Sequence, residues 1–226
     1  MSVERTFGMI QSTLFDSPEI DTAPRVVVDR GGSVTYDRYY FNPETADELL
    51  KTLLAQGVWK QNYLKMYGRE IAFPRLTAWY GEKDAAYKYS GVENEPLPWL
   101  PILRKVRDRL YQDSKVKFNS VLLNLYRNGD DSLSWHADDE RELGNTPVIA
   151  SISLGASRTF QLRSCDDRKI VTVELEHGSL LLMSGETQRN WEHRVPKQKD
   201  LLVPRINLTF RVVLARRNEG AALSPT

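Results

Sequence analysis

The chain has 226 residues, a length that suits one domain built around one sizeable core. Hydrophobic residues make up 41% of the chain and charged residues 27%, as in an ordinary globular protein, and no stretch is apolar enough to span a bilayer. The net charge of +1 argues against a strongly basic nucleic-acid-binding protein. Residues 60–75 and 104–117 are locally basic, but such runs are usually solvated faces.

The two ends of the chain carry little structural signal. Residues 1–24 and 216–226 are polar without clear periodicity, so we predict flexible segments around one domain of residues 25–215. The start of the chain lacks the apolar run of a signal peptide, and the single cysteine, Cys165, cannot form an internal disulfide. We therefore expect a cytoplasmic protein, or a nuclear one in a eukaryote. We also expect it to be monomeric.

Two helices are predicted in the first half of the chain. Asn42 is a good N-cap, Pro43 is a good first residue, and Gly57 follows the apolar stripe as a stop signal. A second helix is expected from about Leu100 to Gln112. The N-terminal third is thus predicted to be helical and rich in loops.

After residue 116 the pattern changes to short apolar segments punctuated by Gly, Asn, Asp and Pro. These segments predict strands over 118–126, 148–154, 158–163, 169–175, 179–184 and 204–214. Short strands at this spacing favour a sandwich, barrel or jelly roll over a parallel α/β sheet.

The histidines give the first chemical clue. The chain has three of them: His136, His177 and His193. His136 lies two residues before Asp138, so on an extended segment both side chains face the same side. A third ligand from a distant strand, either His177 or His193, would complete the two-histidine, one-carboxylate set that binds Fe(II) in oxygenases. Taken alone, the H-x-D triplet is weak evidence, because a satisfied loop histidine also fits it.

The last predicted strand has one strongly polar face. Its odd-numbered residues carry two guanidinium groups, an amide and a hydroxyl: Arg205, Asn207, Thr209 and Arg211. Arginine binds carboxylates bidentately, so this face suits a dicarboxylate ligand inside a barrel. A strand with one solvated face would show the same pattern.

The strand over 118–126 repeats this arrangement. Val121, Leu123 and Leu125 make an apolar face, while Asn124 and Tyr126 offer an amide and a phenol on the other. Both polar groups can donate hydrogen bonds to a bound acid. An edge strand with a wet face fits the pattern as well.

The segments WHADDE, WEHRVPK and PRINLTFR together resemble the AlkB family of Fe(II)/2-oxoglutarate-dependent dioxygenases. The resemblance runs from about Val58 to Arg211. Within that family the chain is most similar to the third eukaryotic homologue, which acts on single-stranded DNA and RNA, and to its bacterial relatives. It implies an α+β fold with a double-stranded β-helix (jelly-roll) core, N-terminal helices and a nucleotide-recognition lid. It also implies an enzyme that uses Fe(II), 2-oxoglutarate and O2.

The resemblance assigns roles to individual residues. The metal ligands would be His136, Asp138 and His193, which leaves His177 a structural role. The 2-oxoglutarate site would consist of Asn124, Tyr126, Arg205, Asn207, Thr209 and Arg211. Of the two arginines, Arg211 is preferred as the partner of the distal carboxylate, with Arg205 ordering the site.

Other residues would face the substrate. Asp139 and Glu140 would act as active-site acids that line the base pocket, and Tyr80, Tyr87 and Tyr89 would form the nucleotide lid. Aromatic side chains suit that role because flipped or single-stranded bases are held by stacking. Trp79 is expected in the core.

The implied reaction is oxidative dealkylation of 1-methyladenine and 3-methylcytosine in DNA, and also in RNA, with release of formaldehyde. Both lesions are cationic, so nearby acids would favour them. One alternative is a 2-oxoglutarate-dependent hydroxylase or demethylase of a protein or small molecule, which the near-neutral charge favours. Another is a non-catalytic binding module, which the intact ligand set opposes. Residues 11–15, QSTLF, resemble the Q-x-x-L-F motif by which bacterial repair proteins dock on the sliding clamp.

Overall fold

The computed structural model describes residues 23–66, 68–85, 87–89 and 92–214. Residues 64–66, 87–89 and 92–94 are described by their backbone alone. The expected tail of 216–226, the clamp-like segment 11–15 and nearly all of the expected N-terminal segment lie outside the described residues. Within the described chain, no helix is long and apolar enough to cross a membrane.

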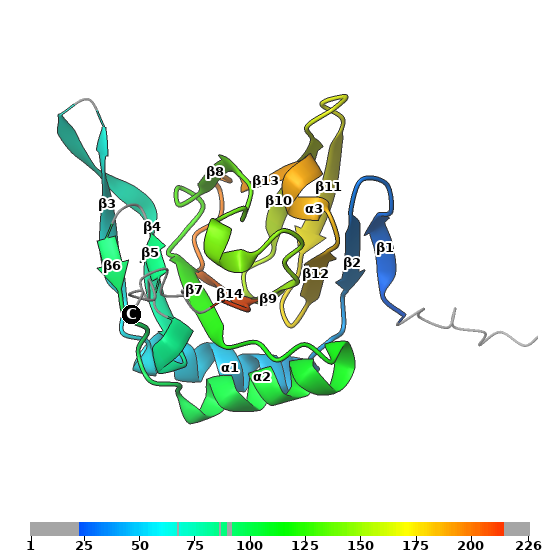
Figure 1. Ribbon diagram of the computed structural model, residues 1–226. Helices are drawn as coiled ribbons and strands as arrows, with labels where there is room; N and C mark the ends of the chain where they lie inside the picture. Colours follow the sequence, from blue (N-terminus) through cyan, green and yellow to red (C-terminus); the bar gives the residue numbers. More distant parts are fainter. Residues whose placement is uncertain (1–22, 67, 86, 90–91, 215–226) are drawn as a thin grey trace, which may run out of the picture.

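Two antiparallel sheets form the body of the protein (Figure 1). The larger sheet has the strand order β1-β2-β12-β9-β14-β7-β4-β3, and the smaller sheet has the order β11-β10-β13-β8. The strands of the larger sheet are β1 (Arg25–Val28), β2 (Ser33–Asp37), β3 (Lys60–Met66), β4 (Arg69–Gly81), β7 (Ser120–Tyr126), β9 (Ile149–Gly155), β12 (Leu180–Ser184) and β14 (Arg205–Arg211). Those of the smaller sheet are β8 (Leu133–His136), β10 (Arg158–Ser164), β11 (Ile170–Leu175) and β13 (Trp191–Val195). This arrangement confirms the predicted jelly-roll core.

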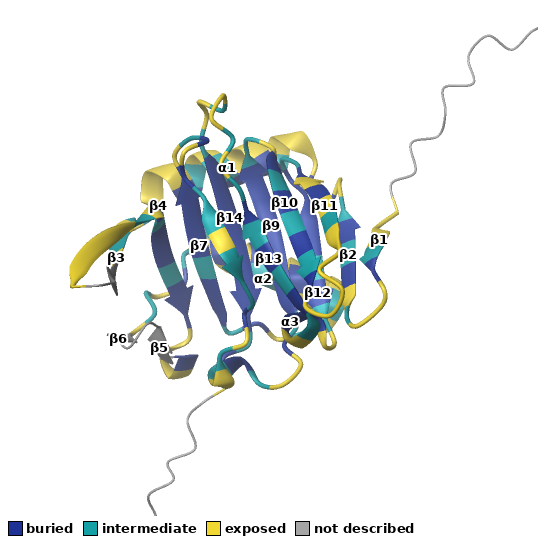
Figure 2. Cartoon of the chain, turned by 90° about the horizontal axis from the view of Figure 1, so that it is seen from above, coloured by how far each residue is buried: buried dark blue, intermediate teal, exposed yellow. Residues whose placement is uncertain are grey.

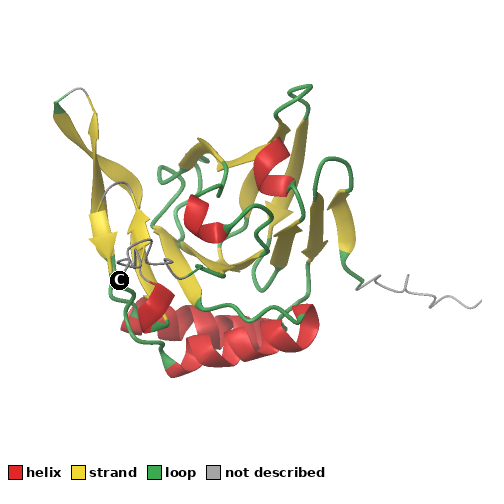
Figure 3. Ribbon diagram, viewed as in Figure 1, coloured by secondary structure: helices red, strands yellow, loops and turns green. Residues whose placement is uncertain are grey.

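Two long helices, α1 (Pro43–Gln56) and α2 (Pro101–Ser114), lie side by side under one face of the larger sheet (Figure 3). The Asn42 side chain caps α1 by accepting a hydrogen bond from the Thr45 N–H at 2.9 Å. Helix α2 ends at Lys115, which adopts a left-handed conformation with φ 59°. Both helices therefore form where the sequence predicted them, within about two residues.

Shorter elements complete the fold. They are the 3-10 helices η1 (Lys83–Ala85) and η2 (Arg141–Leu143), the helix α3 (Thr187–Asn190), and a two-stranded sheet of β5 (Tyr87–Tyr89) and β6 (Val92–Asn94). The β3–β4 hairpin projects beyond the sheets (Figure 1).

The larger sheet is buried on both faces. One face packs on the helices through residues such as Leu53, Leu103 and Leu123. The other face meets the smaller sheet in a second apolar cluster that includes Phe160 and Leu181. Figure 2 shows the buried strands running through the middle of the molecule. Polar residues on this second face are therefore placed between the sheets, where a ligand can be enclosed.

The prediction for the N-terminal third was wrong in one respect. The segment contains α1 but is otherwise mainly strand, from β1 to β4, because the edge strands of the larger sheet come from this part of the chain. In β4 the apolar residues alternate with Arg75 and Thr77, which face the space between the sheets and break the apolar pattern. The six strands predicted after residue 116 are present, but β8 and β13 were not predicted.

Candidate metal centre

His136, Asp138 and His193 converge between the two sheets. His136 is the last residue of β8, and its direct neighbour in the sheet is His193 on β13. Asp138 follows two residues after His136. One ligand atom from each of the three side chains lies within 4.8 Å of the others, and the two imidazole centroids are 4.1 Å apart. The structure therefore brings the three predicted metal ligands to one point.

The protonation states suit a divalent cation. His136 Nδ1 lies 2.9 Å from the carbonyl oxygen of Ser134, so a proton on Nδ1 leaves Nε2 free to ligate. Burial lowers the pKa of His193 to about 3, aided by the positive charges of His136 and Arg211. Burial opposes ionisation of Asp138, but Arg211 and the two histidines hold the net pKa of this carboxyl below its usual value. Two imidazoles and one carboxylate are the donor set that Fe(II) oxygenases use.

A cavity with an empty volume of about 600 Å³ opens beside the triad. All six residues predicted for 2-oxoglutarate line it: Asn124, Tyr126, Arg205, Asn207, Thr209 and Arg211. They come from β7 and β14, which are paired so that Asn207 lies opposite Asn124 and Arg205 opposite Tyr126. The residues predicted for the cosubstrate and those predicted for the metal thus line one cavity.

Arg205 is the cation best placed to receive an anion in this cavity. Its Nη2 donates to Ser153 Oγ at 2.8 Å and to Asn207 Oδ1 at 2.7 Å. Its buried Nε and Nη1 have no hydrogen-bond partner among the described residues. Burial lowers the pKa of Arg205 to about 10, so the guanidinium stays charged at neutral pH. A buried charge with open donors is costly unless a ligand pairs with it.

Arg211 has a different partner. Its Nη2 donates to Asp138 Oδ1 at 2.7 Å, and both side chains are buried. The sequence favoured Arg211 as the partner of a distal carboxylate, but this ion pair leaves Arg205 as the arginine with buried donors that lack a partner among the described residues. Arg211 is paired with Asp138, and the Arg205 guanidinium lies over the Tyr126 ring, 5.2 Å from its centroid. Alternation along a strand shows that both arginines share a face but not which acid each one meets.

Arg75 also lines the cavity, although it was predicted only as part of a locally basic run. The side chain is buried, and its Nε donates to Asn124 Oδ1 at 2.8 Å. Arg75 thereby orients a cosubstrate residue from the neighbouring strand β4. Arg75 and Thr77 are two residues apart on β4 and so lie on the same face of the strand. This pattern could have indicated a polar inner face, but only if β4 had been predicted.

The fold and this site have known relatives. The family model described as the 2OG-Fe(II) oxygenase superfamily matches residues 33–211. Human DNA oxidative demethylase ALKBH2 is 38% identical over 185 residues, which cover 77% of this chain and 71% of that protein. The chain belongs to the AlkB family. Human alkB homolog 3, named an alpha-ketoglutarate-dependent dioxygenase, is 44% identical over 184 residues, which cover 77% of this chain but 64% of that protein.

The AlkB fold is also visible in a solved structure. OsALKBH1 superimposes with a TM-score of 0.59 at 17% identity, over 81% of this chain and 99% of that chain. At this identity the likeness concerns the fold alone.

The two acids after the metal carboxylate lie in different places in this AlkB-family chain. Glu140 lines the metal cavity, its Oε2 is buried without a partner among the described residues, and burial raises its pKa. Asp139 is exposed and lines a separate hollow together with Gln188 and Arg189. The structure therefore favours Glu140 over Asp139 as the acid that faces a substrate.

The aromatic residues of β4 are not arranged as predicted. Tyr80 was expected to face the substrate, but it is 1% exposed, belongs to the core under the helices, and its hydroxyl accepts a hydrogen bond from the Val58 N–H at 3.0 Å. Trp79 was expected in the core; it is half-buried, packs against a small apolar cluster that includes Leu143 and Val213, and also lines a hollow beside the metal cavity. The side chains of Tyr87 and Tyr89 lie outside the described residues.

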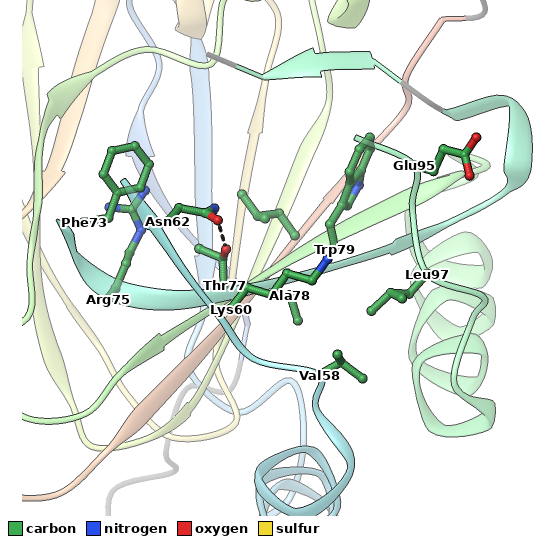
Figure 4. A pocket seen from close by; sticks show the side chains of 11 residues that line it. Val58, Lys60, Asn62, Phe73, Arg75, Thr77, Ala78, Trp79, Glu95 and Leu97 are labelled. Atoms are coloured by element: carbon green, nitrogen blue, oxygen red, sulfur yellow. Dashed lines mark hydrogen bonds between the residues drawn. The ribbon is translucent and has the colours of Figure 1, made fainter. Parts of the chain in front are cut away.

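That hollow has an empty volume of about 700 Å³. Arg75 and Leu122 line both it and the metal cavity, so the two spaces adjoin. Figure 4 shows Trp79 and Glu95 on one side and Arg75 with Phe73 on the other. Aromatic faces near a cation suit a nucleobase and its phosphate.

His177 lies outside the metal centre, as predicted. Its Nδ1 accepts a hydrogen bond from the Gly155 N–H at 2.8 Å, and its Nε2 is 3.3 Å from Asp47 Oδ1. These contacts tie the loop after β9 to helix α1. Cys165 is an exposed free thiol.

Proposed function

We propose that this protein removes N-alkyl groups from nucleobases by Fe(II)- and 2-oxoglutarate-dependent oxidation. The observation that carries the proposal is the joining of the His136–Asp138–His193 triad and the open Arg205 guanidinium in one cavity. The relatives named as DNA oxidative demethylases support a nucleic-acid substrate.

Each residue of the cavity has a task in this proposal. His136, Asp138 and His193 would hold Fe(II), and bound iron supplies the activation of O2 that accompanies oxidative decarboxylation of 2-oxoglutarate. Arg205 and Tyr126 would bind the distal carboxylate of 2-oxoglutarate. The remaining work of the protein is to orient the reactants and to exclude water.

Several residues would act by holding others in place. Asn207 accepts hydrogen bonds from Arg205 and from Ser151 Oγ, and donates to Thr209 Oγ1 at 2.8 Å. Arg75 would keep the Asn124 amide turned toward the cosubstrate. Such a network lowers the entropic cost of ordering the ligand.

The lesions would be 1-methyladenine and 3-methylcytosine, in which methylation leaves a positive charge on the base. Glu140, at the edge of the metal cavity, is the acid placed to interact with that charge. The hollow lined by Trp79 would receive part of the nucleotide. The target would be DNA, with single strands preferred, and RNA as well.

The test is turnover of a panel of oligonucleotides carrying 3-methylcytosine, as single- and double-stranded DNA and RNA, with succinate and formaldehyde measured together. We expect both products from wild type and neither from His136→Ala. Succinate without formaldehyde for every oligonucleotide would contradict the proposed nucleic-acid substrate but would still support the Fe(II)- and 2-oxoglutarate-dependent chemistry.

A second candidate keeps the same chemistry on a protein side chain or small molecule. The near-neutral net charge of +1 favours it. Oligonucleotide affinity that falls steeply with salt would support the nucleic-acid substrate, because binding to phosphates releases counterions. Affinity independent of salt would favour the second candidate.

We further propose that the protein acts as a monomer in the cytoplasm, or in the nucleus of a eukaryote, and that residues 11–15 dock it on a sliding clamp. The clamp proposal rests on sequence alone, because this segment lies outside the described residues. Deleting residues 1–20 should abolish clamp binding while leaving 2-oxoglutarate turnover intact. Unchanged clamp binding after the deletion would remove this part of the proposal.

A further inference from the structure

Gln188 on α3 contacts the metal centre from outside the cavity. The side chain is buried, and its Oε1 accepts a hydrogen bond from the Asp138 N–H at 2.9 Å. Its Nε2 lies 3.6 Å from the sulfur of Met183, a residue that lines the metal cavity. Gln188 is thus wedged between a metal ligand and a wall of the cavity, although it was not among the residues predicted for the site.

The backbone of Asp138 depends on this contact. Strand β8 ends at His136, so Asp138 lies in the loop beyond the sheet. The amide oxygen of Gln188 takes the place of a strand partner for its N–H. At the other end of the residue, Arg211 holds Oδ1. Asp138 is therefore fixed both at its main chain and at its carboxylate.

Helix α3 is itself held firmly. Thr187 is 1% exposed, and its hydroxyl accepts a hydrogen bond from the Ser33 N–H at 3.0 Å. The turn before β2 packs so closely that a Cβ at Gly32 would lie 2.8 Å from Thr187 Cα. The Gln188 amide is therefore presented from an anchored element and can act as a fixed reference for Asp138.

We propose that Gln188 is a positioning residue for the metal carboxylate and sets the affinity of the site for its divalent cation. By accepting the Asp138 N–H it keeps the carboxylate aimed at the point where His136 and His193 converge. Partners of metal ligands typically change metal affinity by about 10- to 100-fold when they are removed. The inference rests on the metal centre of the proposed function and not on the identity of the oxidised substrate.

The test uses Mn(II) as the probe, with binding followed by loss of the free-ion EPR signal. Gln188→Met conserves volume but removes the amide acceptor, and we expect it to raise the Kd for Mn(II) about tenfold or more. Gln188→Glu keeps an acceptor oxygen in either protonation state, and should recover most of the lost affinity. Arg189→Gln changes the exposed neighbour on the same helix and should bind Mn(II) like wild type.

Thermal unfolding of the metal-free variants separates positioning from mere support of the fold, because a structural role would lower the unfolding midpoint without changing the Kd. If the Met variant does not fold, Gln188→Asn, whose amide is one methylene shorter, takes its place with the same expected rise in Kd. A Kd within about twofold of wild type in the acceptor-lacking variant overturns the inference, and so does an equal loss in Gln188→Glu. Failure of wild type itself to bind Mn(II) would instead count against the proposed metal centre.

Discussion

At the scale of single residues, two arginines on one strand differ in their partners within the cavity. Arg211 is paired with Asp138, whereas Arg205 has buried donors without a hydrogen-bond partner among the described residues. Removing one partner of a buried charge pair typically costs about 2–5 kcal/mol. Replacing the two arginines should therefore weaken the binding of different ligands.

Replacing Arg205 by Met should raise the Kd for 2-oxoglutarate about a hundredfold, because the distal carboxylate loses its charged partner. Replacing Arg211 by Met should instead raise the Kd for Mn(II), because Asp138 loses its ion pair. Calorimetric titration with Mn(II) alone, and then with 2-oxoglutarate at saturating Mn(II), separates the two effects. Normal 2-oxoglutarate binding by Arg205→Met would contradict the assignment.

The two neighbouring acids offer a matched pair of variants. Glu140→Gln should lower kcat/KM for 3-methylcytosine about tenfold or more, because a buried carboxylate near a cationic base is lost. Asp139→Asn should change it by about twofold or less, since Asp139 is exposed and lines another hollow. Initial rates of formaldehyde release give both values. A larger loss of kcat/KM in Asp139→Asn than in Glu140→Gln would indicate that Asp139, and not Glu140, is the acid near the base.

Residue types and parity were enough to pair His136 with Asp138 and to predict the polar faces of two strands, whereas the choice of His193 over His177 and the roles in 2-oxoglutarate binding came from the family resemblance. The spacing of His136 and Asp138 and the alternation along β14 depend only on strand geometry. The choice between Arg205 and Arg211, and the role of Arg75, depend on cross-strand neighbours. Those neighbours follow from the order of strands in the sheet, which a single sequence taken by itself does not specify.

At the scale of elements, β4 shows how parity decides which aromatic lines the hollow beside the metal cavity. Tyr80 shares a face with Ala78 and packs toward the helices, while Trp79 shares a face with Arg75 and Thr77. Both aromatics are adjacent in sequence, so a shift of one residue exchanges their roles. The prediction put Tyr80 toward the substrate, although it lies in the core, because β4 itself was not recognised.

A pair of variants tests this parity. Trp79→Leu should weaken oligonucleotide binding about tenfold, because stacking on an aromatic contributes about 1–3 kcal/mol. Tyr80→Phe should leave binding unchanged and lower the free energy of unfolding by about 1 kcal/mol, through the lost hydrogen bond to Val58. Fluorescence anisotropy and chemical denaturation provide the two readouts. Weaker binding in Tyr80→Phe, with stability unaltered, would place Tyr80 at the substrate after all.

The strands that carry the two histidines escaped prediction for a physical reason. β8 has four residues and β13 has five, and each carries one histidine at a position that faces the cavity. In β13 His193 separates the buried apolar residues Trp191 and Val195, so the apolar run is too short to signal a strand.

The loop between β7 and β8 supplies a prediction about pH. Asp131 is buried there, which opposes ionisation, but hydrogen bonds from Arg127 hold its pKa below the usual value of 3.8. A carboxyl with a depressed pKa contributes stability above its unfolded-state pKa, and this stability is lost as the pH falls through the folded-state pKa.

Asp131→Asn should therefore lower the free energy of unfolding at pH 7 by about 1–2 kcal/mol and flatten its decline below about pH 4. Chemical denaturation of the metal-free protein from pH 7 to pH 3 measures both effects. Asp130→Asn, at an exposed neighbour, is the control and should follow wild type. The same acid-dependent loss of stability in Asp131→Asn and wild type would show that this carboxyl is not responsible.

At the scale of the whole molecule, the helices cover one face of the larger sheet and leave the other face to the smaller sheet (Figure 1). One wall of the cavity is therefore the larger sheet, and the helices pack against the opposite face of that sheet. Composition and periodicity predicted this layered β core and both helices. The N-terminal edge strands remained unpredicted, because their burial depends on partners far away in the chain.

The central claim is that one cavity oxidises an N-methyl base with Fe(II) and 2-oxoglutarate. The most direct measurement starts from an anaerobic mixture of the protein, Fe(II), 2-oxoglutarate and a single-stranded 3-methylcytosine oligonucleotide, and quantifies the products after O2 is admitted. We predict equal amounts of succinate, formaldehyde and unmodified cytosine, and no products from His193→Ala. Formaldehyde from His193→Ala at the wild-type rate, or no repaired cytosine from wild type, would contradict the account.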